Sequence, residues 1–157
     1  MQRYEIKPNV GVGPMLLGMT REQVGDALDS CTDLDQESDA TVDYAFGNSL
    51  QIEYDSSGKA HFIGVGFYSG CGCDYEFHGK HIGDYSARSL FELLADLDGG
   101  DHEYSRDGYF FPRIMMNDWD ADEQYDYRGG ESNPVYGQVG VQTKKTVTTT
   151  DGVGEKL

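Results

Sequence analysis

Two capped helix starts, each followed by alternating apolar residues, place the strongest limits on the fold. Thr20 and Gln23 form a capping box, in which each side chain bonds the other residue's backbone N–H. Met19 and Val24 occupy the two positions of a hydrophobic staple around this cap. Apolar and polar residues then alternate over 41–68, which predicts about three antiparallel strands. The first half of the chain therefore predicts a helix followed by an antiparallel sheet.

The same order returns in the second half of the chain. Ser86 caps a second helix 66 residues after the first cap, and a Gly-Gly pair ends that helix. The sequence DGYFFPRIMMNDWD then predicts a strand pair, and VYGQVGVQTKKTVTTT predicts the last strands. Val139 and Val141 take the positions that Ile63 and Val65 hold in the first half. The second half therefore predicts another helix followed by a sheet.

These two units predict a single α+β domain over residues 1–157. Each unit is a helix followed by an antiparallel β-meander. The tandem repeat is expected to form one curved sheet with both helices on one face. The pseudo-repeats run over 4–70 and 76–150, and the polar residues 151–157 are expected to form a frayed tail.

The charge of the chain limits the classes of partner. Its 157 residues include 12 Lys and Arg against 28 Asp and Glu, which gives a formal net charge of −16. Nucleic acids and anionic membrane surfaces bind cationic proteins, so neither is an expected partner. The acidic balance fits a basic protein partner, divalent cations, a salty environment or solubility alone.

Neither a membrane segment nor a signal peptide is visible in the sequence. No run approaches the ~18 apolar residues that a membrane-spanning helix needs. The first residues, MQRYEIKPN, lack the apolar core and the cleavage pattern of a leader. The expected location is the cytoplasm, where Cys31, Cys71 and Cys73 would remain free thiols.

The glycine-rich stretch GVGPMLLG, residues 11–18, raises the question of a loop that holds a phosphate before a helix. It contains no lysine, and Leu16 stands where the pattern G-x-G-x-x-G needs its third glycine. We interpret the stretch as a structural approach to the first helix rather than as an anion site.

The segment CGCDYEFHGKH, residues 71–81, is the leading candidate for a binding site. Cys71, Cys73, His78 and His81 could supply two thiolates and two imidazoles to a tetrahedral zinc ion. Their spacing departs from the usual zinc knuckle, which has a longer gap between its cysteines. Two other interpretations stay open: an ordinary linker between the halves, and a redox pair formed by the two cysteines.

The segment NDWDADEQYDYRGGE, residues 117–131, carries acidic and aromatic residues together. Its spaced carboxylates resemble a calcium loop, but Glu123 and Gly129 stand where that loop needs glycine and glutamate. Tryptophan and tyrosine are typical anchors of protein interfaces. The predicted partner surface consists of Asp118, Trp119, Asp120, Asp122, Tyr125 and Tyr127. The alternatives are a solvated acidic loop and packing of the aromatic rings against the sheet.

The stretch GPMLLGMTREQVGDAL resembles the start of a known supersecondary unit. Gly18, Met19, Thr20 and Val24 match a Gly-Met-Thr/Ser-x-x-x-Val pattern of the SmpA/BamE outer-membrane assembly lipoproteins and of the beta-lactamase inhibitor protein (BLIP) family. In these families the pattern opens a helix pair before an antiparallel sheet, and BLIP is a tandem of two such units. The start is also similar to short acidic bacterial proteins that begin GVGxGPxxxGMTxxEV, some from toxin–immunity neighbourhoods.

The resemblance implies a fold and favours protein binding, because fold alone does not define a function. Two family features have no counterpart in this sequence: the lipidated cysteine near the start of the lipoproteins, and the disulfides of BLIP. The resemblance covers the first half of the chain best, and the second half by pattern only.

We therefore expect a non-enzymatic protein-binding module, of an inhibitor or immunity type, whose partner is a basic protein. Signatures such as G-x-S-x-G and H-E-x-x-H do not occur, so no catalytic residue and no cofactor are assigned. The alternative is a small zinc-binding protein or metalloenzyme that uses the 71–81 cluster. A third interpretation is a structural domain without a specific ligand.

Overall fold

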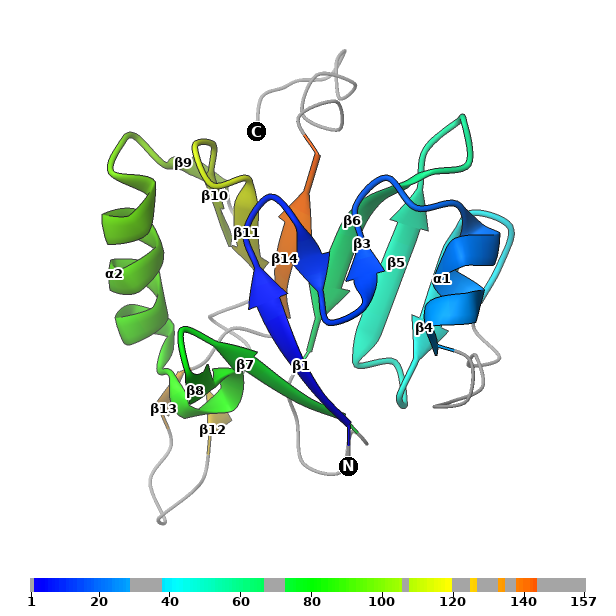
Figure 1. The fold of residues 1–157 in the computed structure, drawn as a ribbon. Helices are drawn as coiled ribbons and strands as arrows, with labels where there is room; N and C mark the ends of the chain where they lie inside the picture. The colour runs from blue at the N-terminus through cyan, green and yellow to red at the C-terminus, as the bar shows by residue number, and fades with distance from the viewer. Residues whose placement is uncertain are drawn as a thin grey trace.

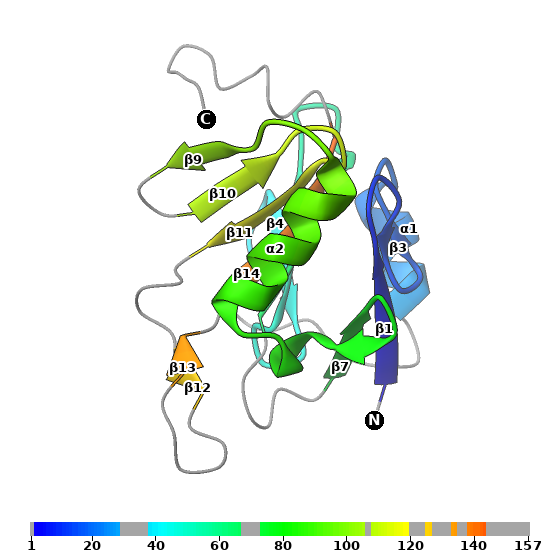
Figure 2. The same ribbon diagram turned by 90° about the vertical axis from the view of Figure 1, so that its left-hand side faces the viewer.

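The chain folds into two layers, one a large sheet and the other a smaller sheet with two helices (Figure 1, Figure 2). The structure, a computed structural model, describes residues 2–28, 38–66, 73–105, 108–119, 125–126, 133–134 and 138–143. Within these ranges no helix is both long enough and apolar enough to cross a membrane. The predicted α+β class is confirmed.

A seven-stranded antiparallel sheet takes its strands from both halves of the chain. In sheet order the strands are β4 (Val42–Ala45), β5 (Leu50–Tyr54), β6 (Ala60–Val65), β14 (Gln138–Gln142), β11 (Met116–Trp119), β10 (Gly108–Phe111) and β9 (Glu103–Ser105). The halves join where β6 pairs with β14, with Val65 opposite Val139 and Ile63 opposite Val141. The valines that the sequence analysis matched to Ile63 and Val65 are thus their direct neighbours.

A five-stranded mixed sheet forms part of the second layer. In sheet order its strands are β3 (Met15–Leu16), β2 (Gly11–Val12), β1 (Gln2–Lys7), β7 (Cys73–Phe77) and β8 (Lys80–His81). β1 and β7 run parallel, with Tyr4 opposite Tyr75. A short 3-10 helix, η2 (Ile82–Asp84), follows β8, and β12 (Tyr125–Asp126) pairs separately with β13 (Asn133–Pro134).

Both helices begin at the caps that the sequence predicts. The helices are α1 (Arg21–Leu28) and α2 (Ala87–Asp98). The Thr20 hydroxyl accepts from the Gln23 N–H at 3.2 Å, and the Gln23 amide oxygen accepts from the Thr20 N–H at 2.9 Å. Ser86 accepts from the Ser89 N–H, and Gly99 ends α2 with a φ of 65°. The capping box and both ends of α2 are therefore confirmed.

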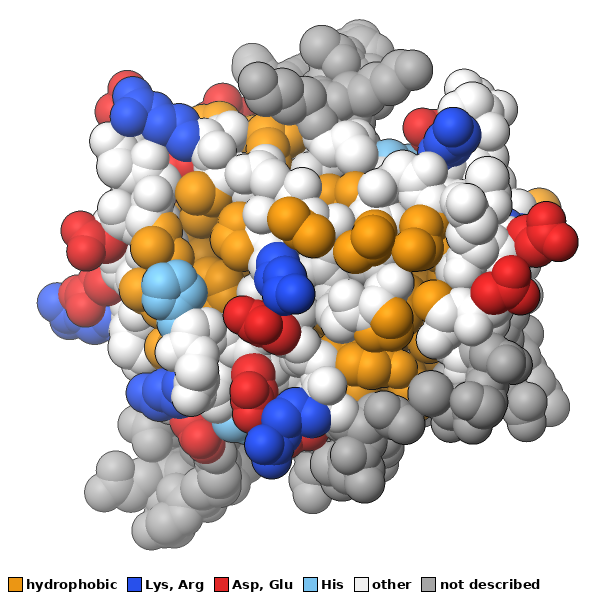
Figure 3. Space-filling view, in the orientation of Figure 1, with side chains coloured by type: hydrophobic (Ala, Val, Ile, Leu, Met, Phe, Trp, Pro, Cys, Tyr) orange, Lys and Arg blue, Asp and Glu red, His pale blue; other side chains and the backbone are white. Residues whose placement is uncertain are grey.

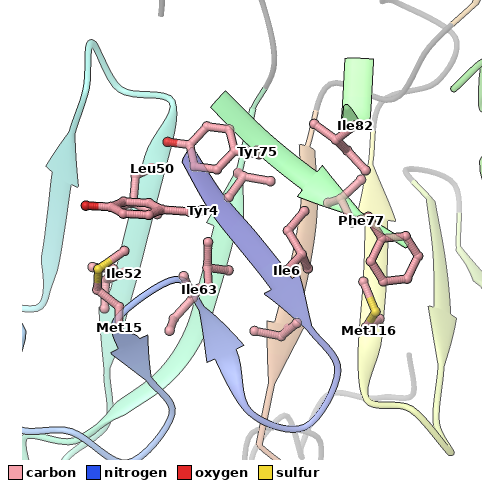
Figure 4. Packing of buried hydrophobic residues seen from close by; sticks show 14 of the residues in the cluster. Tyr4, Ile6, Met15, Leu50, Ile52, Ile63, Tyr75, Phe77, Ile82 and Met116 are labelled. Atoms are coloured by element: carbon pink, nitrogen blue, oxygen red, sulfur yellow. The ribbon is translucent and has the colours of Figure 1, made fainter. Parts of the chain in front are cut away.

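The hydrophobic core lies between the two layers (Figure 4). Alternate residues of β1 and β7 are buried, because successive side chains of a strand point to opposite faces. Tyr4 and Ile6 on β1 pack with Tyr75 and Phe77 on β7 and with the apolar residues of β5 and β6. The Tyr75 hydroxyl lies 2.8 Å from the Ser49 hydroxyl, so its polar end is also satisfied.

The prediction of one curved sheet built from two tandem units is wrong in one respect: the chain forms two principal sheets. The five-stranded sheet fills the space between α1 and α2 on one face of the larger sheet (Figure 1). A two-fold rotation that relates β6 to its antiparallel neighbour β14 would also make β1 and β7 antiparallel. They are parallel, so no single two-fold axis relates the two halves.

A cluster of polar side chains ties the start of α1 to the large sheet. The Arg21 guanidinium donates to both carboxylate oxygens of Asp43 on β4, with Nε–O distances of 3.2 and 3.1 Å. It also bonds the backbone carbonyls of Asp39, Ala40 and Val42. The Tyr54 hydroxyl donates to Asp43 at 2.8 Å. Asp43 is only 3% exposed. The charge of its carboxylate is paired with that of Arg21, and both of its oxygens accept hydrogen bonds.

The Tyr54 phenol is expected to keep its proton where exposed tyrosines lose theirs. Burial, and then its hydrogen bond to Asp43, raise the pKa of Tyr54 well above the ordinary value of 10.0. Because the folded state holds this proton more tightly than the unfolded state, the proton adds to the free energy of unfolding. The contribution is complete below about pH 10, and it is lost as the pH rises through the folded-state pKa. Urea unfolding across this range should show a loss of stability that is smaller in Tyr54→Phe. An identical alkaline loss in both proteins would contradict the prediction.

Candidate functional site

The candidate zinc ligands in the described part of residues 71–81 do not share one face of the small sheet. Cys73 is buried on the core face, together with Tyr75 and Phe77. His81 on β8 is opposite Glu76 and therefore lies on the other face of the sheet. His78 is exposed in the turn between the two strands, where its φ is 52°. The structure does not bring these three predicted ligands together.

The fourth predicted ligand, Cys71, lies outside the described residues. In the ranges that the structure does describe, no three His, Cys, Asp or Glu side chains are grouped so as to hold a metal ion. Cys73 is buried, and its Sγ lies 3.8 Å from the backbone oxygen of Asp74, a typical environment for a structural cysteine. Zinc binding stays a prediction that this geometry does not support.

His81 is instead held between a backbone N–H and a carboxylate. Its Nδ1 accepts from the Gly83 N–H at 2.9 Å, which caps η2. Its Nε2 lies 2.7 Å from an oxygen of Asp74. Arg3 on β1 lies beside the same carboxylate, at 3.4 Å, and beside Glu76, at 3.1 Å. The group is a surface charge network that joins β1, β7 and β8.

The geometry fixes the tautomer of neutral His81. An Nδ1 that accepts from Gly83 carries no proton, so the proton must be on Nε2, which faces Asp74. Long-range proton–nitrogen NMR of the neutral ring should show the Nε2–H form for His81. The exposed His78 serves as the comparison. A dominant Nδ1–H form of His81 would contradict the arrangement.

The predicted partner surface over 118–127 is described only in part. Asp118 is fully buried on β11, where its carboxylate accepts from the Tyr109 N–H at 3.0 Å. This carboxylate therefore faces the interior and not a partner. The backbones of Trp119 and Tyr125 lie in β11 and β12. Asp120, Asp122 and Tyr127 lie outside the described residues.

A group of aromatic side chains gathers beside this segment, between α2 and the end of the large sheet. It consists of Phe91, His102, Tyr104, Tyr109 and Phe111, called here the aromatic cluster. The ring of Phe91 on α2 lies 4.6 Å from that of Tyr109 and 5.0 Å from that of His102. The rings of Tyr104 and Tyr109 are 5.1 Å apart. Tilted and edge-on contacts at these distances are favourable for aromatic pairs.

The aromatic cluster is buried at one end and exposed at the other. Phe111 is fully buried, Phe91 and Tyr109 are half-buried, His102 is exposed and Tyr104 is 66% exposed. The front of the molecule shows hydrophobic side chains gathered between α2 and the strands beside it (Figure 3). The buried rings anchor the exposed ones, which can therefore present apolar area without losing much rotational freedom.

Local sequence positions this cluster. Asp98, the last residue of α2, is buried, and one of its oxygens accepts from the N–H groups of Arg113 and Ile114. The same turn is held from the other side, where Arg113 donates to the Gly99 carbonyl. These bonds join the end of α2 to the turn between β10 and β11. They fix the distance between the helix and the strands that carry the rings.

The surroundings of the exposed rings are acidic. Asp101 and Glu103 flank His102 in the sequence, and both are exposed. Glu103 lies opposite Phe110 and so points to the other face of the sheet from Tyr104. The exposed rings and the exposed acidic residues are thus neighbours in sequence, with Tyr104 on one face of the sheet and Glu103 on the other. This combination suits a ligand that carries positive charge.

The sequence analysis missed this cluster, although a signal was present. The dipeptide Asp107–Gly108 is a strong hairpin turn signal, and tyrosines stand on both sides of it at 104 and 109. A two-residue turn at Asp107–Gly108 would place Tyr104 opposite Phe111, whereas the observed register places it opposite Tyr109. The signal therefore predicts a hairpin here but not its register. That helix α2 packs on this hairpin through Phe91 could not be derived from local pattern.

We compared the chain with models of known protein families, with curated proteins and with solved structures. None of the three comparisons found a match.

Proposed function

We propose that this protein is a non-enzymatic protein-binding module, of an inhibitor or immunity type, that recognises a basic protein. The observation that carries the proposal is the aromatic cluster, in which Tyr104 is 66% exposed and lies in a stretch of sequence that also carries the exposed residues Asp101 and Glu103. Tyrosine, because it offers a large rigid contact area with a polar tip, is enriched at the energetic centres of interfaces.

The charge of the chain supports a basic partner. A formal net charge of −16 attracts cationic proteins over long distances and speeds their encounter. It repels nucleic acids and anionic membranes for the same reason. At contact, a cationic side chain of the partner would stack on the exposed rings and pair with the carboxylates. Charge would thus guide the approach, and the rings would add affinity at contact.

The order of the elements supports the resemblance to BLIP-like units, which remains part of the proposal. In the first half α1 precedes β4, β5 and β6, and in the second half α2 precedes β9, β10, β11 and β14. We therefore keep the pseudo-repeats at 4–70 and 76–150 as a proposal about origin. The parallel pairing of β1 with β7 is an addition that such units do not require.

Photo-crosslinking tests the proposal at the residue that carries it. The photoreactive p-benzoylphenylalanine would replace Tyr104, and in a control protein Glu22, which is exposed on α1. We expect a discrete product with a basic protein from position 104 alone. Excess unlabelled protein should suppress that product, and high salt should weaken it because salt screens the attraction.

Two outcomes would overturn the proposal. One is the absence of a discrete product from position 104. The other is an equal yield from position 22, since α1 lies away from the aromatic cluster (Figure 1). Circular dichroism of both substituted proteins shows that they are folded, so that a negative result reflects the surface and not the fold.

A further inference from the structure

The two edge strands of the seven-stranded sheet differ in how their outward backbone groups are hydrogen-bonded. At the β4 edge, the Val42 carbonyl accepts from the Asp39 N–H at 2.8 Å and from Arg21 at 3.2 Å. The Val42 N–H donates to the Asp39 carboxylate, and the Tyr44 N–H donates to the Ser38 hydroxyl at 2.9 Å. The backbone groups that β4 turns away from β5 are therefore bonded within the chain. Such covering protects an edge from pairing with another strand.

The opposite edge, β9, carries no equivalent covering in the part of the chain that the structure describes. Its strand partner is β10, through Glu103, Tyr104 and Ser105. Alternate residues of an antiparallel edge strand direct their N–H and C=O away from the partner strand. Within the described ranges, no hydrogen bond joins these outward groups to another segment. β9 also contains no proline and no lysine, the residues that commonly block an edge.

We infer that β9 accepts an additional β-strand, contributed by an extended cationic segment of the partner protein. This inference rests on the proposed function, because it describes how the same site would hold its partner. The added strand would pair with the N–H and C=O groups of those alternate residues of β9 that point away from β10. Strand addition gives affinity through main-chain bonds and specificity through alternate side chains.

The side chains around β9 define the chemistry of that segment. Tyr104 faces α2 together with Tyr109, whereas Glu103 faces the other side of the sheet. An apolar residue of the added strand that faces α2 would therefore meet an aromatic ring, and its cationic neighbour in sequence would lie on the same face as the Glu103 carboxylate. Alternating cationic and apolar residues would suit both faces.

The charge also argues against a second copy of this chain as the occupant. Pairing β9 with β9 of another copy would bring together two proteins that each carry a formal net charge of −16. The repulsion between them opposes the contact, whereas a cationic segment is attracted. A self-paired dimer is thus an outcome that the test must be able to detect.

Binding of synthetic peptides tests the inference directly. The probe is a fluorescent nine-residue peptide of alternating lysine and valine, and its matched control is N-methylated at four consecutive central residues. N-methylation removes the backbone donors and keeps the charge and the side chains. We expect the control to bind at least about tenfold more weakly, because main-chain bonds carry this mode of binding. Equal binding of the two peptides would overturn strand addition.

Two substitutions locate the peptide at one edge. Tyr104→Ala in β9 is expected to weaken binding about tenfold, because it removes an exposed ring from the site. Tyr44→Ala in β4, the matched change at the covered edge, should leave binding unchanged. In NMR spectra the amides of 103–105 should shift on peptide addition, and those of 42–45 should not. Equal effects of the two substitutions would overturn the assignment to β9.

The outcomes separate this inference from the proposed function. A crosslink from position 104, together with equal binding of both peptides, leaves the protein-binding role intact and excludes strand addition. Failure of both the crosslink and the peptide overturns both. If light scattering shows a dimer that Tyr104→Ala dissociates, the occupant is a second copy, and the cationic segment is excluded.

Discussion

Arg21→Ala is expected to lower the free energy of unfolding by about 2 to 3 kcal/mol, among the largest effects of any single polar change in this chain. The substitution leaves the Asp43 carboxylate, only 3% exposed, with the Tyr54 hydroxyl as its remaining bonded side chain. A buried charge without its partner destabilises the folded state, because the free energy of removing the charge from water is no longer compensated. The Arg21 side chain is itself 38% exposed, so water screens the pair, and we expect a smaller loss than for a fully buried ion pair. Urea unfolding followed by circular dichroism measures the change.

Arg88→Ala is the matched control for this experiment. Arg88 lies in the first turn of α2, as Arg21 does in α1, and it also pairs with a carboxylate, that of Glu92. Both members of this second pair are well exposed, at 88% and 63%. Such a pair contributes about 0.3 to 0.5 kcal/mol. Equal losses in the two variants would show that burial of Asp43 does not determine the effect.

Gly11→Ala is expected to destabilise the fold by about 2 to 3 kcal/mol through overpacking. A Cβ at Gly11 would lie 2.1 Å from the backbone oxygen of Met15 and 2.9 Å from the Cα of Leu16. Both atoms belong to the backbone of β3, which pairs with β2 at this point, so neither can turn aside as a side chain can. Thermal unfolding should show a clear drop in the melting temperature.

Gly25→Ala provides the opposite expectation for the same chemical change. Gly25 lies in the middle of α1, and a Cβ there would meet nothing within 4 Å. Alanine favours the helix over glycine by about 0.5 to 1 kcal/mol, so this variant should be more stable than the parent. A loss of stability in Gly25→Ala, or none in Gly11→Ala, would contradict the described packing.

The elements that could be predicted are those whose signals lie close together in the sequence. The capping box at Thr20, the cap at Ser86 and the glycine stop at 99 each involve residues within about one helical turn. The alternation in 41–68 likewise identifies β4, β5 and β6, because their turns are short. Local chemistry was sufficient for these elements.

The five-stranded sheet could not be predicted in the same way. Its central pair joins β1 to β7, and Tyr4 lies opposite Tyr75. The two paired residues are separated in the sequence by most of the first half of the chain. Parallel pairing over such a separation has no local signal. The alternation of Cys73, Tyr75 and Phe77 was visible in the sequence, but it overlapped the Cys and His pattern that suggested a metal.

The candidate site was predictable only as a neighbourhood. Acidic and aromatic residues near 118–127 suggested a partner surface, and β11, which contains Asp118, pairs with β10 of the aromatic cluster. The burial of Asp118 could not be anticipated, because alternation does not say which face of an isolated strand is covered. The approach of α2 to Tyr109 and Phe111 is a tertiary contact that no local pattern encodes.

The position of β14 has a consequence for the order in which the protein can assemble during synthesis. Among the described residues β14 is the last strand of the large sheet, yet it lies between β6 and β11, near the middle. Until the ribosome has released it, β4–β6 and β9–β11 can form only separate three-stranded pieces, with no direct pairing between them. β14 therefore joins the two pieces last, and a nascent chain that lacks it leaves an unpaired edge on β6 and another on β11, which chaperones and proteases can recognise.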